Sequence, residues 1–313
     1  MKSLYFIISV FMAGFIVAGC GGGEDGTDGS SENGKLKIVA TIGMIADVAN
    51  NVGGENVEVV GLMGPGVDPH TYKASAGDVT RMSEADLILY NGLHLEGAMS
   101  EVLQKVGQRA NTYAVAEAVD ESRLLSSADY EGAHDPHIWF DVSIWMKAVE
   151  GIRDRLIELD SDNQEAYQDN ADKYLEEMKE LHQYVLDRAS SVPENQRVLI
   201  TAHDAFNYFG RAYGFEVRGL QGISTASEAG TADVQNLSEF IATNQIPAIF
   251  VESSVPVRNI EAVQAAVKSR GFGVKIGGEL FSDAMGTSGT PEGTYLGMVR
   301  HNIDTIVSSL KPE

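Results

Sequence analysis

The sequence contains only one cysteine, Cys20, among its 313 residues. An intramolecular disulfide requires two thiols, and zinc fingers and ribbons require several thiolates, so both kinds of site are excluded.

The sequence also lacks an apolar run of transmembrane length at its start. The stretch Leu4–Val17 is interrupted by Ser9 and Gly14, and its length of about 14 residues falls short of the roughly 20 that span a bilayer. It follows Lys2 and ends at small residues, which is typical of a secretory signal peptide. Residues 1–19 are therefore predicted to be removed.

The residues around Cys20 predict how the mature chain begins. Val17-Ala18-Gly19-Cys20 resembles a bacterial lipobox, in which the cysteine becomes the lipidated first residue. An ordinary signal peptide with an accidental cysteine is the alternative. Residues 20–35 carry no large apolar side chain, so we expect a flexible tether. The globular part should lie in the cell envelope, outside the cytoplasmic membrane and held to it by the lipid.

Basic residues are scarce. The chain has 23 Lys and Arg against 45 Asp and Glu, a formal net charge of −22. This balance argues against binding to nucleic acid and against docking to anionic lipid. Two interpretations stay open: an acidic surface that concentrates cations, or one that is merely well solvated.

Short apolar runs rich in β-branched residues alternate with amphipathic segments, which favours an α/β fold with mainly parallel sheets and crossover helices. The predicted strands are 36–42, 57–62, 87–90, 198–202, 216–220, 248–251 and 273–276. The predicted helices include 45–54, 75–85, 205–213, 234–244 and 258–269. We expect two lobes, residues 36–160 and 192–313, each with its own sheet.

The segment between the lobes, residues 161–191, is predicted to be one long rigid helix. Asp162–Ser190 contains no glycine or proline, and its apolar residues Tyr174, Met178, Leu181 and Val185 recur every three or four positions. About 29 residues at 1.5 Å each would extend about 43 Å. Two shorter helices separated by a break are the alternative.

The tripeptide Asp-Pro-His occurs twice, ending at His70 and at His137, in a chain with seven histidines. His203 ends a third apolar run, and Asp283 follows the last predicted strand. Three neutral imidazoles and one carboxylate make a complete shell for a divalent transition metal. Proline fixes its own φ and restricts the preceding residue, so the two tripeptides should hold their imidazoles in set directions.

All four candidate ligands follow a predicted strand or apolar stretch. In open α/β sheets, ligands bind beyond the carboxyl ends of the strands. His70 and His137 belong to the first lobe, whereas His203 and Asp283 belong to the second. A site that takes two ligands from each lobe must lie in the cleft between them.

At these residues the chain resembles the metal-binding receptor lipoproteins of bacterial ABC importers for zinc, manganese or iron. The resemblance covers residues 36 to 310. The segments that carry it are Val67–Tyr72, Ala85–Leu93, Asp135–Trp139, Thr201–Phe206, Val251–Ser254 and Gly277–Ala284.

The resemblance implies that His70, His137, His203 and Asp283 are the metal ligands. The third position is histidine here, as in the family's branch associated with Zn²⁺ and Mn²⁺; Fe²⁺ is a further candidate. The long histidine-rich loop of many dedicated zinc receptors is absent, since only Glu131–His134 precedes the second ligand. The implied partner is the permease of an ABC metal importer, and the receptor is expected to be a monomer.

The remaining polar residues near the motifs have less specific interpretations. His134 is expected in a solvent-facing loop, His94 in a turn or at a permease contact, and His182 and His301 in structural or exposed positions. Asp68, Asp135 and Asp204 adjoin the histidine ligands. They are expected either to orient the imidazoles through the second ring nitrogen or to cap turns.

Reversible capture is the predicted function, with affinity that falls as the pH drops through roughly 6.5 and the imidazoles take up protons. The alternatives are a secreted zinc hydrolase and a surface adhesin. A catalytic zinc keeps an open coordination position, whereas four protein ligands close the shell, and the chain has no His-Glu-x-x-His motif. We therefore expect no enzymatic activity.

Overall fold

The computed structural model describes residues 34–127 and 132–311. The predicted signal peptide, Cys20 and nearly all of the predicted tether lie outside the described residues. Within the described part, none of the helices combines the length and the apolar character needed to cross a bilayer.

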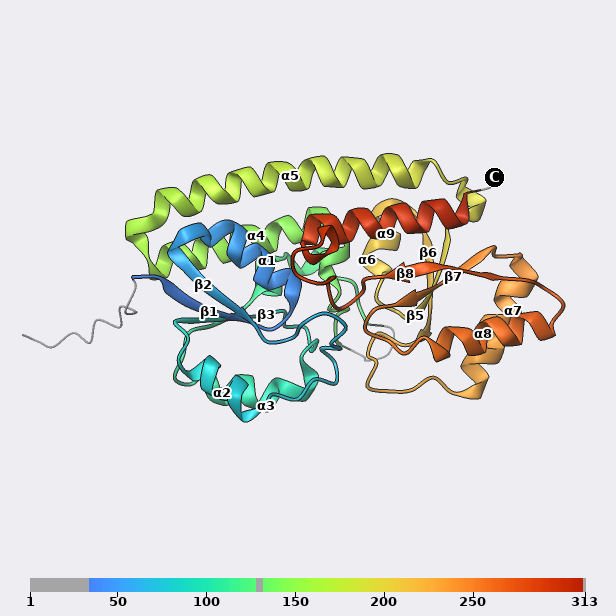
Figure 1. Cartoon of the computed structure of the whole chain (residues 1–313), viewed down its shortest axis with the longest axis horizontal. Coiled ribbons are helices and arrows are strands. Elements are labelled where there is room, and N and C mark those ends of the chain that lie inside the picture. The colour runs from blue at the N-terminus through green and yellow to red at the C-terminus, as the bar shows by residue number, and fades with distance from the viewer. Residues whose placement is uncertain (1–33, 128–131, 312–313) are drawn as a thin grey trace, which may run out of the picture.

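The N-terminal half is built on a parallel sheet with the strand order β2-β1-β3-β4 (Figure 1). Its strands are β1 (Leu36–Ala40), β2 (Val57–Gly61), β3 (Leu87–Tyr90) and β4 (Thr112–Ala114). Its helices are α1 (Gly43–Gly53), α2 (Ala76–Ser83), α3 (Ser100–Val106) and α4 (Val142–Leu159). Ile38–Ala40 of β1 and Leu87–Leu89 of β3 are buried aliphatic runs, as expected where helices cover both faces of a parallel sheet.

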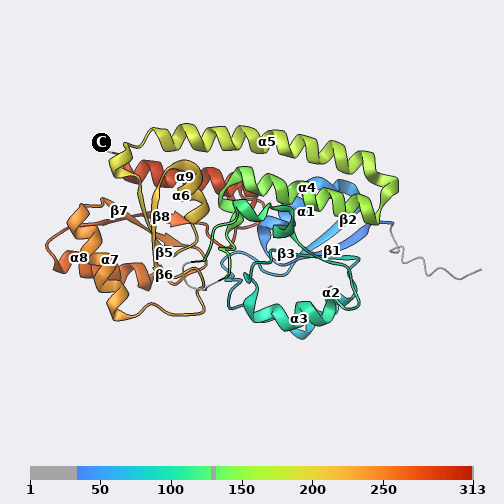
Figure 2. The same cartoon turned by 180° about the vertical axis from the view of Figure 1, so that it is seen from behind.

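The C-terminal half contains two parallel strand pairs, β5–β6 and β7–β8. Their bounds are β5 (Val198–His203), β6 (Glu216–Gln221), β7 (Ala248–Glu252) and β8 (Lys275–Leu280). Strands β5 and β7 lie next to each other, so the two pairs lie side by side within this half (Figures 1 and 2). The helices of this half are α6 (Asn207–Tyr213), α7 (Thr231–Asn244), α8 (Arg258–Ser269) and α9 (Tyr295–Leu310).

Helix α5 (Gln164–Ser190) is continuous over 27 residues and runs along both halves (Figures 1 and 2). Its apolar stripe is buried against α1 and α4 at one end and against α6 and α9 at the other. Hydrogen bonds secure the helix to both halves: the Tyr174 hydroxyl donates to Asp47 of α1, and Arg188 Nε donates to Asp304 of α9. The prediction of an α/β fold with one long linking helix is confirmed. The proposed limits of the lobes, 36–160, 161–191 and 192–313, stay a prediction.

Helix α9 also reaches across the junction between the halves. Its first residue, Tyr295, is fully buried and donates a hydrogen bond through its hydroxyl to the carbonyl of Trp139 in the N-terminal half. The rest of the helix packs on α5 and beside β8. Two packed helices therefore connect the halves.

The sequence did not predict four of these elements, namely β4, α3, α4 and α9. Strand β8 also begins two residues later than the predicted strand and ends four residues later, at Leu280. Its centre contains Gly277, where an added Cβ would lie 2.8 Å from the Phe250 ring and from Ser309 of α9. Close packing therefore requires glycine inside this strand. In the sequence, the same glycine suggested that the strand ended before it.

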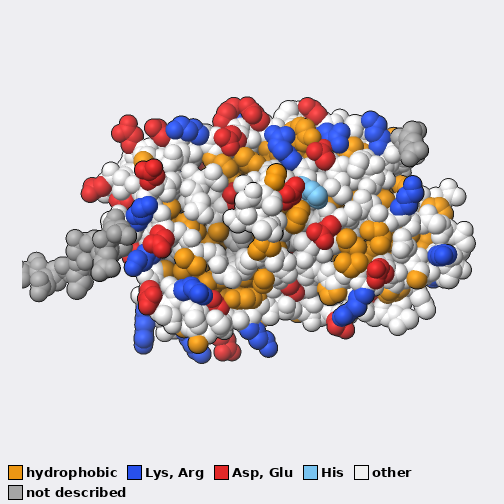
Figure 3. Space-filling view, in the orientation of Figure 1, with side chains coloured by type: hydrophobic (Ala, Val, Ile, Leu, Met, Phe, Trp, Pro, Cys, Tyr) orange, Lys and Arg blue, Asp and Glu red, His pale blue; other side chains and the backbone are white. Residues whose placement is uncertain are grey.

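The visible face in Figure 3 carries acidic and basic side chains interspersed with apolar ones. Opposite charges alternate there, and no large patch of one sign dominates that face. The four candidate metal ligands are buried and contribute little to the molecular surface.

Candidate metal centre

His70 lies in the loop that follows β2. The Asp68 carboxylate accepts a hydrogen bond from the His70 backbone N–H at 2.9 Å and another from the Thr71 hydroxyl at 2.8 Å. The aspartate of the first Asp-Pro-His therefore closes a turn, and this turn directs the imidazole inward. The His70 residue is 5% exposed, which makes it the most accessible of the four candidate ligands.

His137 is positioned in the same way, by the aspartate two residues before it. Asp135 Oδ1 accepts the His137 backbone N–H at 2.9 Å and also faces the His137 Nδ1 at 2.7 Å. The carboxylate thus fixes the ring as well as the turn, and it keeps Nε2 directed at the centre of the site. The Trp139 ring packs edge-on against the His137 imidazole, with centroids 5.3 Å apart.

His203 is the last residue of β5 rather than a residue of the following loop. Glu252, at the end of the adjacent β7, holds it twice: Oε1 accepts the His203 backbone N–H at 2.9 Å, and Oε2 faces His203 Nδ1 at 2.6 Å. Both side chains are fully buried. One carboxylate therefore joins two strands and orients one imidazole.

Asp283 lies in the loop after β8. The side chain of Asn302, from α9, brackets Phe281 by accepting its N–H and donating to its carbonyl. The indole N–H of Trp139 donates to the Ser282 carbonyl at 3.0 Å. Because Trp139 belongs to the N-terminal half, this bond connects the loops of His137 and Asp283 across the junction.

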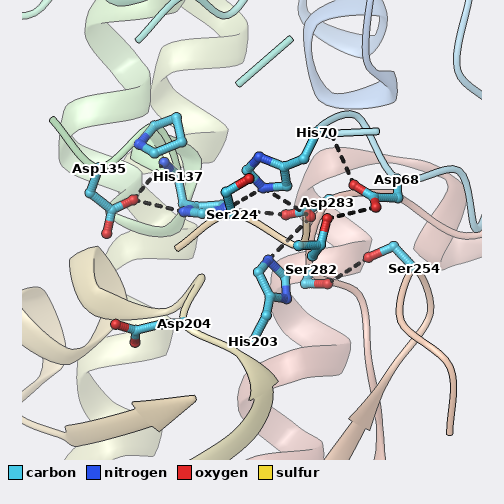
Figure 4. Close-up of polar contacts among 12 residues, drawn as sticks. Asp68, His70, Asp135, His137, His203, Asp204, Ser224, Ser254, Ser282 and Asp283 are labelled. Carbon is cyan, nitrogen blue, oxygen red and sulfur yellow. Dashed lines mark hydrogen bonds and ion pairs between the residues drawn. The ribbon is translucent and has the colours of Figure 1, made fainter. Parts of the chain in front are cut away.

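The four predicted ligands converge on one point (Figure 4). The Nε2 atoms of His70 and His137 are 3.3 Å apart. The Asp283 carboxylate oxygens lie 3.6 Å from Nε2 of His70, 3.5 Å from Nε2 of His137 and 3.2 Å from Nε2 of His203. A tetrahedral shell with bonds of about 2.1 Å has ligand atoms about 3.4 Å apart. The spacing therefore fits one small divalent ion.

Polar atoms without hydrogen-bond partners mark the same point. Among the described residues, Nε2 of His203 and both carboxylate oxygens of Asp283 are buried and have no hydrogen-bond partner. Leaving such groups unpaired costs free energy, and a carboxylate costs more than a neutral group. A cation at the centre would satisfy all of them, so the donor set matches the chemistry of a metal site.

Charge also distinguishes the imidazoles. Burial lowers the pKa of His203, but the carboxylates of Asp283 and Glu252 raise it by more, to well above its usual value. Burial raises the pKa of Asp283, and the surrounding histidines, above all His203, lower it by more. Burial lowers the pKa of His70 to about 4. In the metal-free site these shifts favour the charged form of His203 beside an ionised Asp283, and the neutral form of His70.

Sequence reasoning assigned the neighbouring aspartates only in part. Asp68 accepts a backbone N–H of its turn, and Asp135 both accepts a backbone N–H and faces an imidazole nitrogen. Asp204 lies beside His203 but does not hold its ring, and its Oδ1 is buried without a hydrogen-bond partner. The residue that orients His203 is Glu252, which the sequence did not single out. Its only signal was its position at the end of an apolar strand, within the segment Val251–Ser254.

A second buried carboxylate supports the His137 loop. Glu96 accepts hydrogen bonds from the Asn91 backbone N–H and from the Thr41 hydroxyl, both at 2.7 Å. The Asn91 side chain then donates to the Pro136 carbonyl at 3.0 Å. Burial raises the pKa of the Glu96 carboxyl. These contacts join the carboxyl ends of β1 and β3 to the second ligand loop.

The other histidines lie outside the cluster. His182 of α5 faces the Tyr213 hydroxyl, and His301 of α9 faces the Glu279 carbonyl. His134 lies 3.8 Å from Glu121, and it does not belong to the four-residue cluster. His94 adopts a left-handed backbone conformation in a turn.

The family described as zinc-uptake complex component A, periplasmic (ZnuA), matches residues 38–309. The zinc-binding protein TroA of Treponema pallidum is 52% identical over 285 residues, which cover 91% of this chain and 92% of TroA. Its solved structure superimposes with a TM-score of 0.87 over 89% of this chain and all of that chain.

Two further relatives carry different descriptions. The manganese-binding lipoprotein MntA of Bacillus subtilis is 47% identical over 305 residues, or 97% of this chain and 98% of MntA. The metal ABC transporter substrate-binding lipoprotein SsaB of Streptococcus sanguinis is 31% identical over 316 residues, which cover 99% of each chain. The relatives are thus similar over nearly their full length and differ in the metal that their names state.

Proposed function

The chain belongs to the family of periplasmic zinc-uptake components, and we propose that it captures a divalent transition metal outside the cytoplasmic membrane and delivers it to an ABC importer. The observation that carries this proposal is the convergence of His70, His137, His203 and Asp283 on one buried point. The family comprises transport receptors, and the closed set of four ligands leaves a bound ion no position for a substrate or a reactive water.

We assign all four residues as ligands of the transported ion. His137 and His203 present Nε2, because their Nδ1 atoms face carboxylates. His70 also presents Nε2, and Asp283 supplies the only negative charge of the set. Two ligands from each half hold the ion, so separating the halves or their loops removes half of the shell.

Zn²⁺ and Mn²⁺ are the proposed cargo, with Fe²⁺ as a third candidate. Two relatives that are 52% and 47% identical to the chain are described as a zinc-binding and a manganese-binding protein. Three nitrogen ligands and a tetrahedral spacing favour Zn²⁺ in affinity, since the order of stability places Mn²⁺ lowest. Mn²⁺ becomes the cargo where it is the more available ion.

The proposed anchor is a lipid on Cys20, and the proposed partner is the permease of an ABC importer. Support comes from the descriptions of MntA and SsaB as lipoproteins and of SsaB as an ABC transporter component. The receptor is proposed to act as a monomer that stands off the membrane on residues 20–35. The competing functions, a zinc hydrolase and an adhesin, gain no support from the site or from the relatives.

Metal titration of the purified chain tests this function. The wild-type protein should bind one Zn²⁺ per chain, and His137→Ala should bind at least about a hundredfold more weakly, because one ligand is lost and an Asp135 carboxylate is left without its partner. His301→Ala is the matched control, since this imidazole lies outside the cluster. Stoichiometric binding with equal affinity in His137→Ala would falsify the assignment.

A further inference from the structure

The cavity that reaches the metal centre opens at His70. It has a volume of about 350 Å³ and is lined from the N-terminal half by His70, His94 and His134, and from the C-terminal half by Ile223 and Ser224. His137, His203 and Asp283 do not line it. This cavity thus gives the His70 side of the shell a way to solvent along residues 223 and 224.

Residues 223 and 224 belong to a segment that we call the strap, Gly222–Gly230, which connects β6 to α7. Space lies on its other side as well, in a cavity of about 400 Å³ that both Asp68 and Thr225 line. A third cavity, of about 320 Å³, is lined by Gly222, Ser224 and Ser227 of the strap. The strap is thus bordered by cavities, which leaves it room to move.

One carboxylate connects the strap to the ligand loop. The Thr225 hydroxyl donates a hydrogen bond of 2.6 Å to Asp68 Oδ2. The same Asp68 carboxylate accepts the backbone N–H of His70 through Oδ1. Thr225 comes from the C-terminal half and Asp68 from the N-terminal half, so this pair crosses the junction beside the most accessible ligand. Figure 4 shows Asp68 next to His70 at the margin of the cluster.

We propose that Thr225, through its hydrogen bond to Asp68, is the positioning residue that keeps the metal centre closed, and that the ion enters and leaves past the strap. When the bond is made, the strap covers the His70 side of the shell, and Asp68 holds the His70 turn. When it breaks, the strap separates from the ligand loop and the cavity at His70 widens. This inference rests on the proposed function of the site.

The strength of the bond determines the size of the effect. A hydrogen bond from a hydroxyl to a carboxylate is short and stronger than a neutral one. Its loss should change the rate of ion release about tenfold, which corresponds to about 1.4 kcal/mol. The affinity should fall by a smaller factor than the release rate rises, because an open strap also admits the ion faster.

The experiment compares three variants of the full mature chain loaded with Zn²⁺. Thr225→Val removes the donor and keeps the shape, and Thr225→Ser keeps the donor. Thr231→Val makes the same replacement at an exposed position six residues away, at the start of α7. Asp68 itself is left unchanged, because its substitution would also release the His70 turn. Release is followed by stopped-flow transfer of Zn²⁺ to an excess of a chromogenic chelator.

We expect release about tenfold faster from Thr225→Val, and a wild-type rate from both Thr225→Ser and Thr231→Val. A wild-type or slower rate in Thr225→Val overturns the proposal, and so does equally fast release from Thr225→Ser, since the hydroxyl would then be irrelevant. Failure of the wild-type chain to bind Zn²⁺ would instead overturn the proposed function. The two failures are therefore distinguishable.

Discussion

At the scale of single residues, three carboxylates outside the ligand set determine how the imidazoles are presented. Asp68 and Asp135 each accept the backbone N–H of the histidine two positions later. Asp135 and Glu252 also face the outer ring nitrogens of His137 and His203. An imidazole whose Nδ1 is held in this way directs Nε2 at the ion, so orientation is set before the metal arrives.

Glu252→Gln should weaken Zn²⁺ binding about 10- to 100-fold, the usual cost of losing a carboxylate behind a metal-bound histidine. Glutamine offers one acceptor oxygen where Glu252 accepts two donors, so either the backbone N–H or Nδ1 of His203 is left facing an amide N–H₂ group. Competition with a chelator of known affinity measures the change.

Glu279→Gln is the control for this substitution, because Glu279 is an exposed residue of β8. Equal affinities for the two variants would show that Glu252 has no part in orienting His203.

Zn²⁺ binding at neutral pH should release about one proton, because the metal displaces the proton that His203 holds in the metal-free protein. The pKa of His203 is raised, so the apparent affinity should increase by up to tenfold per pH unit as the pH rises toward that pKa. His70, with a pKa of about 4, should add a second proton only under acidic conditions. The sequence alone predicts that the loss of affinity is centred at about pH 6.5, the usual pKa of histidine.

Calorimetry in buffers of different ionisation enthalpy measures this proton release. An affinity independent of pH between about pH 6 and pH 8 would contradict a protonated His203 in the metal-free state.

Two of the four residues that the structure brings together, His70 and His137, carry a local signature of aspartate and proline in the sequence. The chain contains few histidines, and two of them end identical tripeptides. Glu252 could not be predicted, because His203, the residue that it holds, is 49 residues away in the sequence. Glu96 likewise contacts Thr41, which is 55 residues away, as well as the nearby Asn91. Only folding brings these carboxylates to their partners.

At the scale of elements, the strong apolar periodicity of α5 made this helix predictable, whereas other elements lack a clear periodicity and were not predicted. The apolar stripe of α5 recurs every three or four residues without glycine or proline. Strand β4 has only three residues, and α3 only seven, too few for a period to emerge. Helices α4 and α9 are longer and were also missed. Their apolar faces include aromatic and β-branched residues, such as Trp145 and Ile303, that are poor indicators of a helix.

Leu181→Ala should lower the free energy of unfolding by about 2–5 kcal/mol, because this side chain is fully buried in the stripe of α5. Zn²⁺ affinity should change little, since none of the four ligands lies on α5. Urea unfolding of the metal-free protein and metal titration provide the two measurements. Gln183→Ala, at an exposed position of the same helix, is the control.

At the scale of the whole molecule, the metal centre closes the junction between the halves on the side opposite the packed helices. Helices α5 and α9 join the halves by extensive packing. On the other side, the contacts include Trp139 with Ser282 and Asp68 with Thr225, in addition to the ligand set. The Tyr208 hydroxyl also donates to the Asp135 carbonyl, and the rings of Phe140 and Phe206 stack across the junction. An ion at the centre therefore adds to the contacts that already join the halves.

Zn²⁺ should stabilise the entire molecule. Binding to the native state alone adds about 4 kcal/mol when free metal exceeds the dissociation constant a thousandfold. Because each half supplies two ligands, the added stability should shift the unfolding of both halves to higher temperature together. Differential scanning calorimetry with and without Zn²⁺ tests this. A shift confined to one of two separate transitions would show that the ion is held by one half.

The two helices that cross the junction have a consequence for recognition by the transporter. Both are packed along their length and are secured at residues of either half, so the outline of the molecule should change little when cargo is lost. The overall shapes of the filled and the empty receptor would therefore differ too little for the transporter to distinguish them. Discrimination must then depend on the few loops around the ion.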